Sequence, residues 1–426
     1  MTYKESIDFL FEKFGFFQKQ GKKAYKGSLE NAFLLDNYLK FPHKNFKTIH
    51  VAGTNGKGSV SHFLSAVLQK ANYKVGLYTS PHLKDFRERI KINGNFIPKK
   101  EVINFVSKNK EIILKIKPSF FEITVFMAFE YFSREKVDFA IIEVGLGGRL
   151  DTTNIISPIL SIITNISLDH TNILGNSLEK IAYEKAGIIK NNPIIIGETQ
   201  NEIKEIFIKK AKEKKADIFF ADEIYNAHYS LFYEEKQSFN FYKNENIFYE
   251  NLRTDLKAFY QKKNLITSLA SLDILKKFCK ITRKNIYNGI SNVVETTGFL
   301  GRWQIIGNNP LIICDTAHNL SGIKEVLKQI ENTAYKNLHF IFGVLKDKNI
   351  DEILNILPKN AYYYFTKAKI SRALDEKILQ KKAENFNLNG KTFNKVTEAL
   401  KNAKKISDEN DLIFIGGSTF IVAEIV

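Results

Sequence analysis

Residues 46–60 read Phe-Lys-Thr-Ile-His-Val-Ala-Gly-Thr-Asn-Gly-Lys-Gly-Ser-Val, and this stretch decides the fold. Its first half is an apolar run that predicts a buried strand, and its second half is a glycine-rich turn that carries Lys57. A helix with apolar residues at helical spacing follows. Strand, turn, lysine and helix together predict a phosphate-binding loop, because glycines let backbone N–H groups close around anionic oxygens. The stretch departs from a regular Walker A sequence, since Val51 replaces its first glycine and Gly58 separates Lys57 from Ser59.

Length and composition indicate two domains with large hydrophobic cores. The chain has 426 residues, of which 44% are apolar and 13% aromatic. Its formal charge of +17 would suit a nucleic-acid partner, but the lysines are interleaved with Glu and Asp along predicted helices, as in residues 209–215. This pattern is typical of solvated helix faces, and no motif that reads RNA or DNA is present. We therefore expect no nucleic-acid partner.

Targeting and redox signals favour a cytoplasmic protein. Residues 1–13 predict a mixed-charge amphipathic helix rather than a signal peptide, and no apolar window reaches the ~18 residues of a membrane span. Cys279 and Cys314 lie far apart among apolar neighbours, which favours two inert core thiols over a disulfide or a metal pair. We expect no membrane partner.

Strand and helix patterns alternate along the chain, which predicts parallel, doubly wound sheets. In the first part we expect strands at 74–78, 138–144, 159–166 and 193–197, helices at 2–17, 28–40, 99–115, 121–134, 203–215 and 256–278, and a small antiparallel sheet at 226–250. In the second part we expect strands at 311–315, 339–342, 362–365 and 412–415, and helices at 322–332, 350–357, 376–386 and 396–403. The fold class is α/β, with an N-terminal P-loop-type doubly wound ATPase domain at 1–295 and a smaller C-terminal Rossmann-like domain at 296–426.

Polar residues follow several of the predicted strands, where open α/β sheets bind their ligands. Thr79–His82 follow one strand, Glu143 ends the next, and His170 comes shortly after a third. A carboxylate at the tip of a buried strand beside a phosphate loop is a common Mg²⁺ ligand in nucleotide enzymes. The alternative for Glu143 is a capped or paired carboxylate, and the alternative for His170 is a structural histidine.

Several motifs stand in order along nearly the whole chain. They are His50-Val-Ala-Gly-Thr-Asn-Gly-Lys-Gly-Ser59, Thr79-Ser-Pro-His82, Glu88-Arg-Ile90, Glu143-Val-Gly-Leu-Gly-Gly-Arg-Leu-Asp151, Leu168-Asp-His170, Glu184-Lys-Ala-Gly-Ile188 and Asp315-Thr-Ala-His-Asn319. Together these motifs resemble those of folylpolyglutamate synthases. The bacterial enzymes of this kind are frequently also dihydrofolate synthases, and they belong to the muramyl-ligase superfamily of ATP-dependent amide-forming enzymes.

The resemblance implies a reaction and its partners. The family transfers the ATP γ-phosphate to a substrate carboxylate, and the amine of L-glutamate then attacks the acyl phosphate. The substrates are dihydropteroate or folates, the cofactors are ATP and Mg²⁺ at two sites, and the expected oligomeric state is a monomer. Charge accumulates on phosphoryl and carbonyl oxygens, so the site must concentrate metal and positive charge there.

Matching positions carry the family's roles to this sequence. The residues expected to bind ATP are Thr54, Asn55, Gly56, Lys57, Gly58, Ser59, Asn264, Arg302, Asp315 and His318. Ser80 and Glu143 would bind the first metal and His170 the second. The residues expected to act in catalysis are Lys57, His170 and Lys185, of which Lys185 matches a lysine that the family carbamylates; the alternative for Lys185 is an ordinary helix-end lysine.

The pterin-bearing substrate is expected against three loops. They contribute Gly27, Ser28, Leu29 and Glu30; Ser119, Phe120, Phe121 and Glu122; and Leu150, Asp151 and Thr152. Phe121 offers an aromatic face to a pterin ring, with a core aromatic as the alternative.

The sequence departs from the family pattern at three positions on the nucleotide side. Leu300 stands where a proline is usual, Thr316 where a glycine is common, and Tyr260 where a histidine usually precedes Gln261. Three other functions stay open at this point: folylpolyglutamate synthesis alone, a muramyl ligase of cell-wall precursors, and a nucleotide-switch protein that binds nucleic acid.

Overall fold

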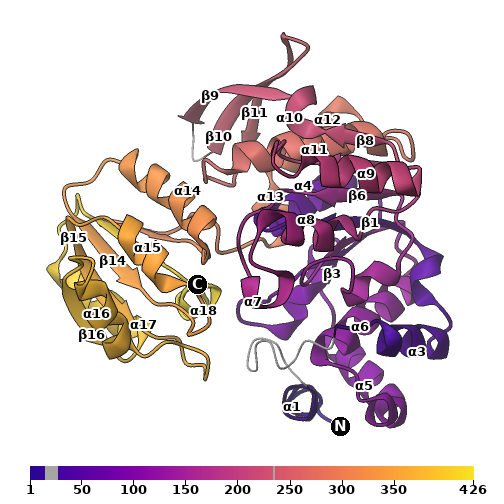
Figure 1. Ribbon diagram of the computed structural model, residues 1–426, viewed down its shortest axis with the longest axis horizontal. Coiled ribbons are helices and arrows are strands. Elements are labelled where there is room, and N and C mark those ends of the chain that lie inside the picture. Colours follow the sequence, from indigo (N-terminus) through magenta and orange to yellow (C-terminus); the bar gives the residue numbers. More distant parts are fainter. Residues whose placement is uncertain (15–26, 234–235) are drawn as a thin grey trace. The chain divides into compact units, whose positions relative to one another are not determined.

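The computed structural model describes residues 1–14, 27–233 and 236–426, with the side chains of 229–233 left out. The chain forms two compact units, which are described separately (Figure 1). Unit 1 contains Met1–Asp255 and Gln261–Phe299, and unit 2 contains Leu256–Tyr260 and Leu300–Val426. Residues 15–17 of the predicted helix 2–17, and the side chains of Tyr229, Leu231 and Tyr233 in the predicted antiparallel sheet, lie outside what is described.

Unit 1 is built on an eight-stranded sheet with the order β4-β3-β2-β5-β1-β6-β7-β8. The strands from β2 to β8 in this order run parallel, and β3 and β4 add an antiparallel edge. Their bounds are β1 Lys47–Ala52, β2 Val75–Tyr78, β3 Ile90–Ile92, β4 Asn95–Phe96, β5 Phe139–Glu143, β6 Leu160–Ile163, β7 Ile194–Ile196 and β8 Ile218–Phe220. The central strands are buried on both faces, which explains their nearly continuous apolar sequence.

Helices cover this sheet and join its strands. One core cluster joins α1, α3, α5 and α6 to β2, β3 and β5, and another joins α8 and α9 to β6 and β7. The helices are α1 Tyr3–Lys13, α3 Glu30–Tyr38, α4 Lys57–Lys70, α5 Lys99–Ile116, α6 Phe120–Arg134, α7 Thr171–Leu174, α8 Leu178–Ala186, α9 Lys204–Lys214 and α10 Ala221–Ile224. Short 3₁₀ turns lie at η2 Pro42–Asn45, η3 Phe86–Arg89 and η4 Thr152–Ile155.

The predicted small antiparallel sheet is confirmed. It has the order β11-β10-β9, with β9 Asn226–Tyr233, β10 Lys236–Lys243 and β11 Asn246–Thr254. Three further helices lie in the described part of unit 1: α11 Gln261–Leu275, α12 Arg283–Ser291 and α13 Val293–Thr297.

Unit 2 has a six-stranded sheet with the order β12-β13-β17-β14-β15-β16, parallel except for β12. The strands are β12 Gln304–Asn308, β13 Leu311–Cys314, β14 Leu338–Phe342, β15 Ala361–Thr366, β16 Gly390–Phe393 and β17 Leu412–Gly416. One core cluster contains α14 Leu320–Glu331, α15 Ile350–Ile356 and α16 Glu376–Glu384, and a second contains α17 Val396–Ile406 and α18 Thr419–Ala423. Helices therefore pack on both faces, and the predicted α/β fold class is confirmed.

One predicted helix is wrong at its start. Residues 256–260 are not the first turn of a helix 256–278 but an irregular segment that belongs to unit 2. The amide of Gln329 on α14 explains this, because it accepts the Phe259 N–H at 2.8 Å and donates to the Lys257 carbonyl at 2.8 Å. Backbone groups used in this way are not available for helical hydrogen bonds. The sequence also gave no signal for the edge strands β12 and β16, which lack a fully buried residue.

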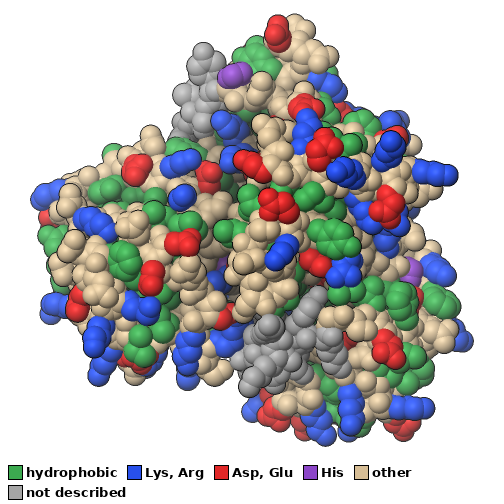
Figure 2. All heavy atoms as spheres, in the orientation of Figure 1, with side chains coloured by type: hydrophobic (Ala, Val, Ile, Leu, Met, Phe, Trp, Pro, Cys, Tyr) green, Lys and Arg blue, Asp and Glu red, His purple; other side chains and the backbone are tan. Residues whose placement is uncertain are grey.

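Surface charge follows the predicted pattern in the described residues, and the thiols follow it in part. On the face shown in Figure 2, Lys and Arg side chains are interspersed with Asp and Glu. In the run 209–215, Glu213 accepts ion pairs from Lys210 and Lys214. Both cysteines are free, and burial raises the pKa of Cys314 to about 12, which keeps this thiol protonated. Cys279 is only half-buried and is therefore not the core thiol that was predicted. No helix of the described residues is long and apolar enough to span a membrane.

Candidate active site

The candidate site of unit 1 lies where four neighbouring parallel strands end. In the order β2-β5-β1-β6, these strands lead into Ser80, Glu143, the loop Gly53–Gly56 and the segment 164–170. The register places Val51 beside Glu143, so β1 and β5 end at nearly the same level. Parallel strands present their carboxyl ends at one edge of a sheet, and the fold therefore brings together polar residues that are far apart in sequence.

The phosphate loop has a backbone that only glycine accommodates at two points. Gly53 has a φ of +142°, and a Cβ added there would lie 1.8 Å from the Thr164 hydroxyl. Gly56 has a φ of +87°, and its Cβ would lie 2.2 Å from the Asn264 amide oxygen. Gly53 and Gly56, two of the three glycines in the motif, are thus required by φ and by close neighbours. Asn264, which was predicted to bind ATP, lies directly under this loop.

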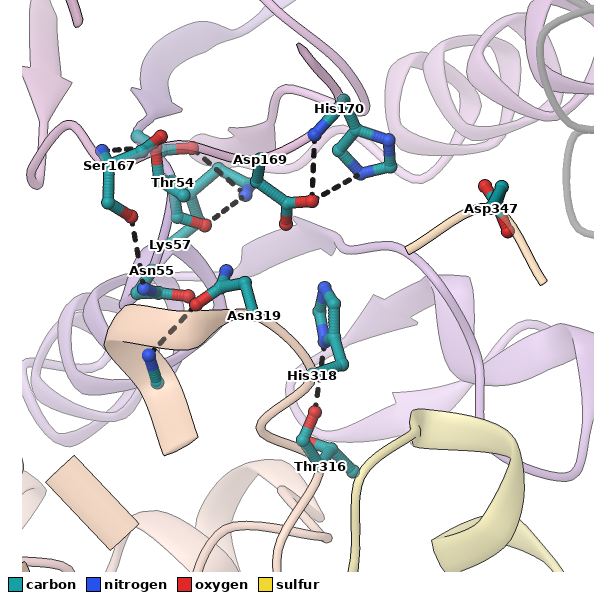
Figure 3. A network of polar contacts seen from close by, with 12 residues as sticks. Thr54, Asn55, Lys57, Ser167, Asp169, His170, Thr316, His318, Asn319 and Asp347 are labelled. Atoms are coloured by element: carbon teal, nitrogen blue, oxygen red, sulfur yellow. Dashed lines mark hydrogen bonds and ion pairs between the residues drawn. The ribbon is translucent and has the colours of Figure 1, made fainter. Parts of the chain in front are cut away.

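The loop after β6 holds the phosphate loop in place. The N–H groups of Thr54 and Asn55 donate to the backbone and side-chain oxygens of Asn165, at 2.9 and 3.0 Å. Thr54 and Ser167 exchange two further hydrogen bonds through the Thr54 hydroxyl (Figure 3). Asn165 and Ser167 were not predicted as site residues, although their position after a strand end was a usable signal.

Helix α4 begins at Lys57, and no side chain caps its first turn. The free N–H groups of a helix N-terminus favour an anion, as the sequence predicts for phosphate. The Lys57 ammonium is folded back onto the loop, where Nζ donates to the carbonyls of Gly53 and Thr54 at 3.1 and 3.2 Å.

Lys185 reaches the same carbonyl from helix α8. Its Nζ donates to the Gly53 oxygen at 2.8 Å, and the side chain is buried. Burial, followed by the charge of Lys57, lowers the pKa of Lys185 to about 7. Asp169 and Asp151 oppose this shift only partly. A large share of this amine is therefore neutral near pH 7, unlike an ordinary helix-end lysine.

Glu143 and Ser80 meet across β5 and β2. The Ser80 N–H donates to Glu143 Oε2 at 3.2 Å, and the Glu143 side chain is buried. His170 has left-handed backbone, with a φ of 50°, and its N–H donates to Asp169 Oδ1 at 2.8 Å (Figure 3). The described residues contain no cluster of three or more His, Cys, Asp or Glu side chains with metal-site geometry. Mg²⁺ needs only a few ligands from the protein, because it takes its other ligands from water and substrate phosphates.

The loop from Gly145 to Asp151 packs against helix α8. The Arg149 N–H donates to the Glu184 carbonyl at 2.7 Å, and the two side chains form an ion pair at 2.8 Å. Asp151 is buried and its carboxylate closes the loop on itself, because it accepts the Leu146 N–H at 2.9 Å and the Thr153 N–H at 3.0 Å. The motif around Asp151 and the motif around Lys185 are thus two sides of one packed structure.

The other residues predicted to bind the acceptor are divided between surface and core. Gly27, Ser28 and Glu30 are exposed at the start of α3, and Leu29 packs against the core. Phe120 is buried, whereas Phe121 is half-buried and its ring lies edge-on to Tyr78, 6.1 Å between centroids. Leu150 is half-buried and can present a face to a ligand, whereas Thr152 is buried.

Ser119 and Glu122 form a capping box at the start of α6. The Ser119 hydroxyl accepts the Glu122 N–H at 3.2 Å, and the Glu122 carboxylate accepts the Ser119 N–H at 2.5 Å. Both side chains are buried. The structure therefore gives each of them a structural partner, whatever either contributes to the acceptor.

Removing this cap is expected to destabilise the protein. Ser119→Ala should lower the free energy of unfolding by about 1 kcal/mol, since it leaves an N–H of the first turn without its acceptor. Ser119→Thr keeps the oxygen and should stay close to wild type. Urea unfolding of the three proteins checks this, and an unchanged midpoint for Ser119→Ala would count against a structural role.

In unit 2, Asp315 braces the end of β13. It is buried, and its carboxylate accepts the Tyr260 hydroxyl at 2.6 Å, the Trp303 N–H at 2.7 Å and the Ala317 N–H at 2.8 Å. Burial raises the pKa of Asp315, while Arg302 and these donors lower it. Tyr260 thus has a definite partner at the position where the family usually has histidine.

The residues that follow Asp315 open helix α14. The Asn319 side chain accepts the Gly322 N–H at 2.8 Å as the N-cap of this helix. His318 Nδ1 lies 3.0 Å from the Thr316 carbonyl (Figure 3). The predicted ATP-binding residues Arg302, Asp315 and His318 all belong to unit 2, whereas Thr54–Ser59 and Asn264 belong to unit 1.

The Tyr260–Asp315 contact is expected to contribute to stability. Tyr260→Phe removes one donor from a buried carboxylate, which should cost about 1–3 kcal/mol. Tyr335→Phe, at an exposed tyrosine, is the matched control. Equal urea midpoints for both variants would show that the hydrogen bond adds nothing.

Comparison with protein families agrees with this architecture. Residues 51–272 match the Mur ligase middle domain, and residues 301–419 match the Mur ligase glutamate ligase domain. The chain is 33% identical to the dihydrofolate synthase/folylpolyglutamate synthase of Bacillus subtilis over 91% of each chain. It is 31% identical to a probable bifunctional folylpolyglutamate synthase/dihydropteroate synthase of Haloferax volcanii, of which it spans half the length.

Solved structures give the same result. E. coli FolC in complex with DHPP and ADP superposes with a TM-score of 0.86 at 27% identity, covering 100% of this chain and 97% of that one. A bifunctional folylpolyglutamate synthase/dihydrofolate synthase with Mn, AMPPNP and L-glutamate bound gives a TM-score of 0.85 at 26% identity, with coverage of 100% and 97%. Mur-type domains, the strand-end site and these relatives together show that the chain belongs to the dihydrofolate synthase/folylpolyglutamate synthase family, ATP- and divalent-metal-dependent ligases that attach glutamate in folate metabolism.

Proposed function

We propose that this chain joins L-glutamate both to dihydropteroate and to reduced folates that already carry glutamate. The observation that carries the proposal is the packing of the loop Gly145–Asp151 against the helix of Lys185, which itself contacts the phosphate loop at Gly53. One packed structure thus links the nucleotide phosphates to the loop expected to bind the acceptor.

The proposed reaction has two steps. A carboxylate oxygen of the acceptor attacks the γ-phosphorus of ATP, the bond to ADP breaks, and an acyl phosphate forms. The amine of glutamate then attacks the acyl carbon and loses a proton, and inorganic phosphate leaves with the oxygen that it gained. Thr54–Ser59 are proposed to surround the triphosphate: the N–H groups at the start of α4 would hold its oxygens, while those of Thr54 and Asn55 stay bonded to Asn165. Lys57 would leave its two loop carbonyls to contact the β- and γ-oxygens.

The metal-binding residues in this proposal are Ser80 and Glu143 for a first Mg²⁺ and His170 for a second. The contact between Ser80 and Glu143 fits this role, since it holds the two residues side by side at the ends of β2 and β5. When bound, the metal neutralises charge that develops on the transferred phosphoryl group. His170 is held by Asp169 through its backbone.

Lys185 is proposed to act as a carbamate. A neutral amine is the form that adds CO₂, and the lowered pKa of Lys185 supplies this form near pH 7. The ammonium first loses one proton; the neutral amine nitrogen then bonds to the carbon of CO₂ and releases a second proton. The cation beside Lys57 thereby becomes an anion. An anionic oxygen at this place relieves the repulsion between the two lysines and suits a metal.

Asn264 of unit 1 is proposed to contact ATP on the adenine side. Arg302, Asp315 and His318 of unit 2 are also proposed to bind ATP. Asp315 would act mainly by bracing the residues around it, because three donors occupy its carboxylate. Phe121 offers its half-buried ring to the pterin. The enzyme is proposed to work as a cytoplasmic monomer.

Product analysis with each acceptor tests this proposal. Phosphate release from Mg-ATP and glutamate is measured with dihydropteroate or with a reduced folate, and each product is identified by mass. Glutamylated product from both acceptors is expected. Product from the reduced folate alone would limit the enzyme to folylpolyglutamate synthesis, and product only from uridine-nucleotide precursors would make it a cell-wall ligase.

A further inference from the structure

A buried histidine that the proposed mechanism does not use lies close to the loop Gly145–Asp151, the acceptor loop. His50 is in β1, three residues before the phosphate loop, and its side chain is completely buried. Nε2 lies 2.8 Å from the Thr153 hydroxyl, whereas Nδ1 has no hydrogen-bond partner among the described residues. Burying a polar ring that has only one hydrogen-bonded nitrogen costs free energy. A histidine retained at such a position is therefore a candidate for a functional role.

The Thr153 hydroxyl has a second partner. It lies 2.5 Å from Asp151 Oδ1, which also accepts the Thr153 N–H. A hydroxyl carries one proton, and an ionised carboxylate only accepts, so the Thr153 proton points to Asp151. The Thr153 oxygen must then accept a proton from His50 Nε2.

The surroundings keep this ring neutral and fix its tautomer. Burial, with a smaller effect of Lys190, lowers the pKa of His50 to about 3. Lys190 is itself held in place, because Nζ donates to the carbonyls of Asn154 and Ile156 in and after η4. If the single ring proton were on Nδ1, it would be a buried donor without an acceptor, whereas on Nε2 it is satisfied.

The contacts therefore form a one-way chain of donors from His50 through Thr153 to Asp151. At its end, the Asp151 carboxylate also accepts the Leu146 N–H at 2.9 Å, near the other end of the acceptor loop. Two loop ends and a central strand are thus joined at one carboxylate.

We infer that His50 is a positioning residue of the ligase: through Thr153 it fixes the orientation of Asp151, and with it the acceptor loop Gly145–Asp151. This inference rests on the proposed role of that loop in binding the pterin-bearing substrate. It assigns to His50 no contact with substrate, nucleotide or metal. The expected signature is a change in the KM for the acceptor, with the KM for ATP unchanged.

Steady-state kinetics on paired variants tests the chain of donors. His50→Leu and Thr153→Val remove a donor, and each should raise the KM for dihydropteroate about tenfold. His50→Gln offers an amide N–H near the position of Nε2, and Thr153→Ser keeps the hydroxyl. Both should stay within about threefold of wild type. The KM for ATP should stay within about twofold in all four, since the phosphate loop keeps its own contacts.

A double-mutant cycle separates this chain from two independent packing effects. Once Thr153→Val has interrupted the chain, adding His50→Leu should change the acceptor KM little further. Effects that multiply, or an equal rise in the KM for ATP, would overturn the inference. If His50→Leu does not fold, His50→Gln and the Thr153 pair still decide, because equal KM values for Thr153→Val and Thr153→Ser would overturn it.

Asp151→Asn separates the role of His50 from the role of the acceptor loop. A raised acceptor KM in Asp151→Asn, without one in His50→Leu and Thr153→Val, would overturn the role of His50 alone. An unchanged acceptor KM in Asp151→Asn would overturn the acceptor loop and the inference that rests on it. Nitrogen-15 NMR of labelled histidine adds a separate check, with the His50 signal assigned by its loss in His50→Leu. An Nε2–H tautomer that stays neutral down to about pH 4 is expected, and an Nδ1–H tautomer would contradict the inference.

Discussion

Glu143→Gln is expected to lower kcat by about 10²–10³ and to raise the Mg²⁺ concentration needed for half-maximal rate. The substitution replaces the carboxylate that is proposed to bind the metal by a neutral amide of the same size. The amide oxygen can still accept the Ser80 N–H, so the backbone contact between β2 and β5 is kept. We therefore expect the variant to fold like wild type and to be impaired in catalysis only.

A matched control makes this result specific. Glu135→Gln neutralises a carboxylate that pairs with Lys74 at the surface of the same unit, and it should leave both parameters unchanged. The measurement is the rate of phosphate release against Mg²⁺ concentration for the three proteins. A Glu143→Gln enzyme with the Mg²⁺ dependence of wild type would remove Glu143 from the metal site.

Lys185→Met should abolish most of the activity while stabilising the nucleotide-free protein. We expect kcat to fall by about 10³, because the variant lacks the amine that is proposed to become a metal-binding carbamate. We also expect the free energy of unfolding at pH 6 to rise by about 1–3 kcal/mol, since a buried ammonium beside Lys57 is replaced by an apolar chain. Opposite effects on activity and stability are typical of groups retained for function.

The pH dependence of this difference has a definite sign. The pKa of Lys185 is lowered from 10.5 to about 7 in the folded protein. Below pH 7 the group is charged in both states and its penalty is complete; above pH 7 the folded form loses its proton and the penalty is relieved. The stability gap between Lys185→Met and wild type should therefore narrow from pH 6 to pH 9 in urea titrations. Lys210→Met, at a surface ion pair, should show no such trend, and a gap independent of pH would contradict the assigned pKa.

Much of the site was predictable because its residues follow apolar strands. The apolar sequences of the run 46–52 and of the strand that ends at Glu143 predict buried strands. Parallel strands place their carboxyl ends at the same edge of the sheet. Glycines in the phosphate loop were equally informative, and the structure explains two of them by φ and by close neighbours. These features depend on local patterns, which a single sequence contains.

Features that depend on distant partners could not be predicted. The segment 256–260 has an apolar pattern suited to a helix, yet Gln329, about 70 residues later, binds its backbone. Tyr260 was noted only as a departure from the family, and its partner Asp315 is visible only in the fold. Ser119 and Glu122 differ from these cases, because their spacing is that of a capping box, a local pattern that the sequence does contain.

His50 illustrates the same limit. It stands inside the most informative motif of the chain, but the sequence does not tell which way its ring points. Its partner Thr153 is more than a hundred residues away, and only the register of β1 against β5 brings the acceptor loop near it.

Transfer of oxygen from acceptor to phosphate is the most direct test of the proposed chemistry. Dihydropteroate labelled with ¹⁸O in its carboxylate is converted with Mg-ATP and glutamate, and the released phosphate is analysed by mass. Attack of the carboxylate on the γ-phosphorus predicts one ¹⁸O atom in each phosphate and the other in the new amide. Phosphate without ¹⁸O, formed together with glutamylated product, would contradict an acyl phosphate and with it the central claim.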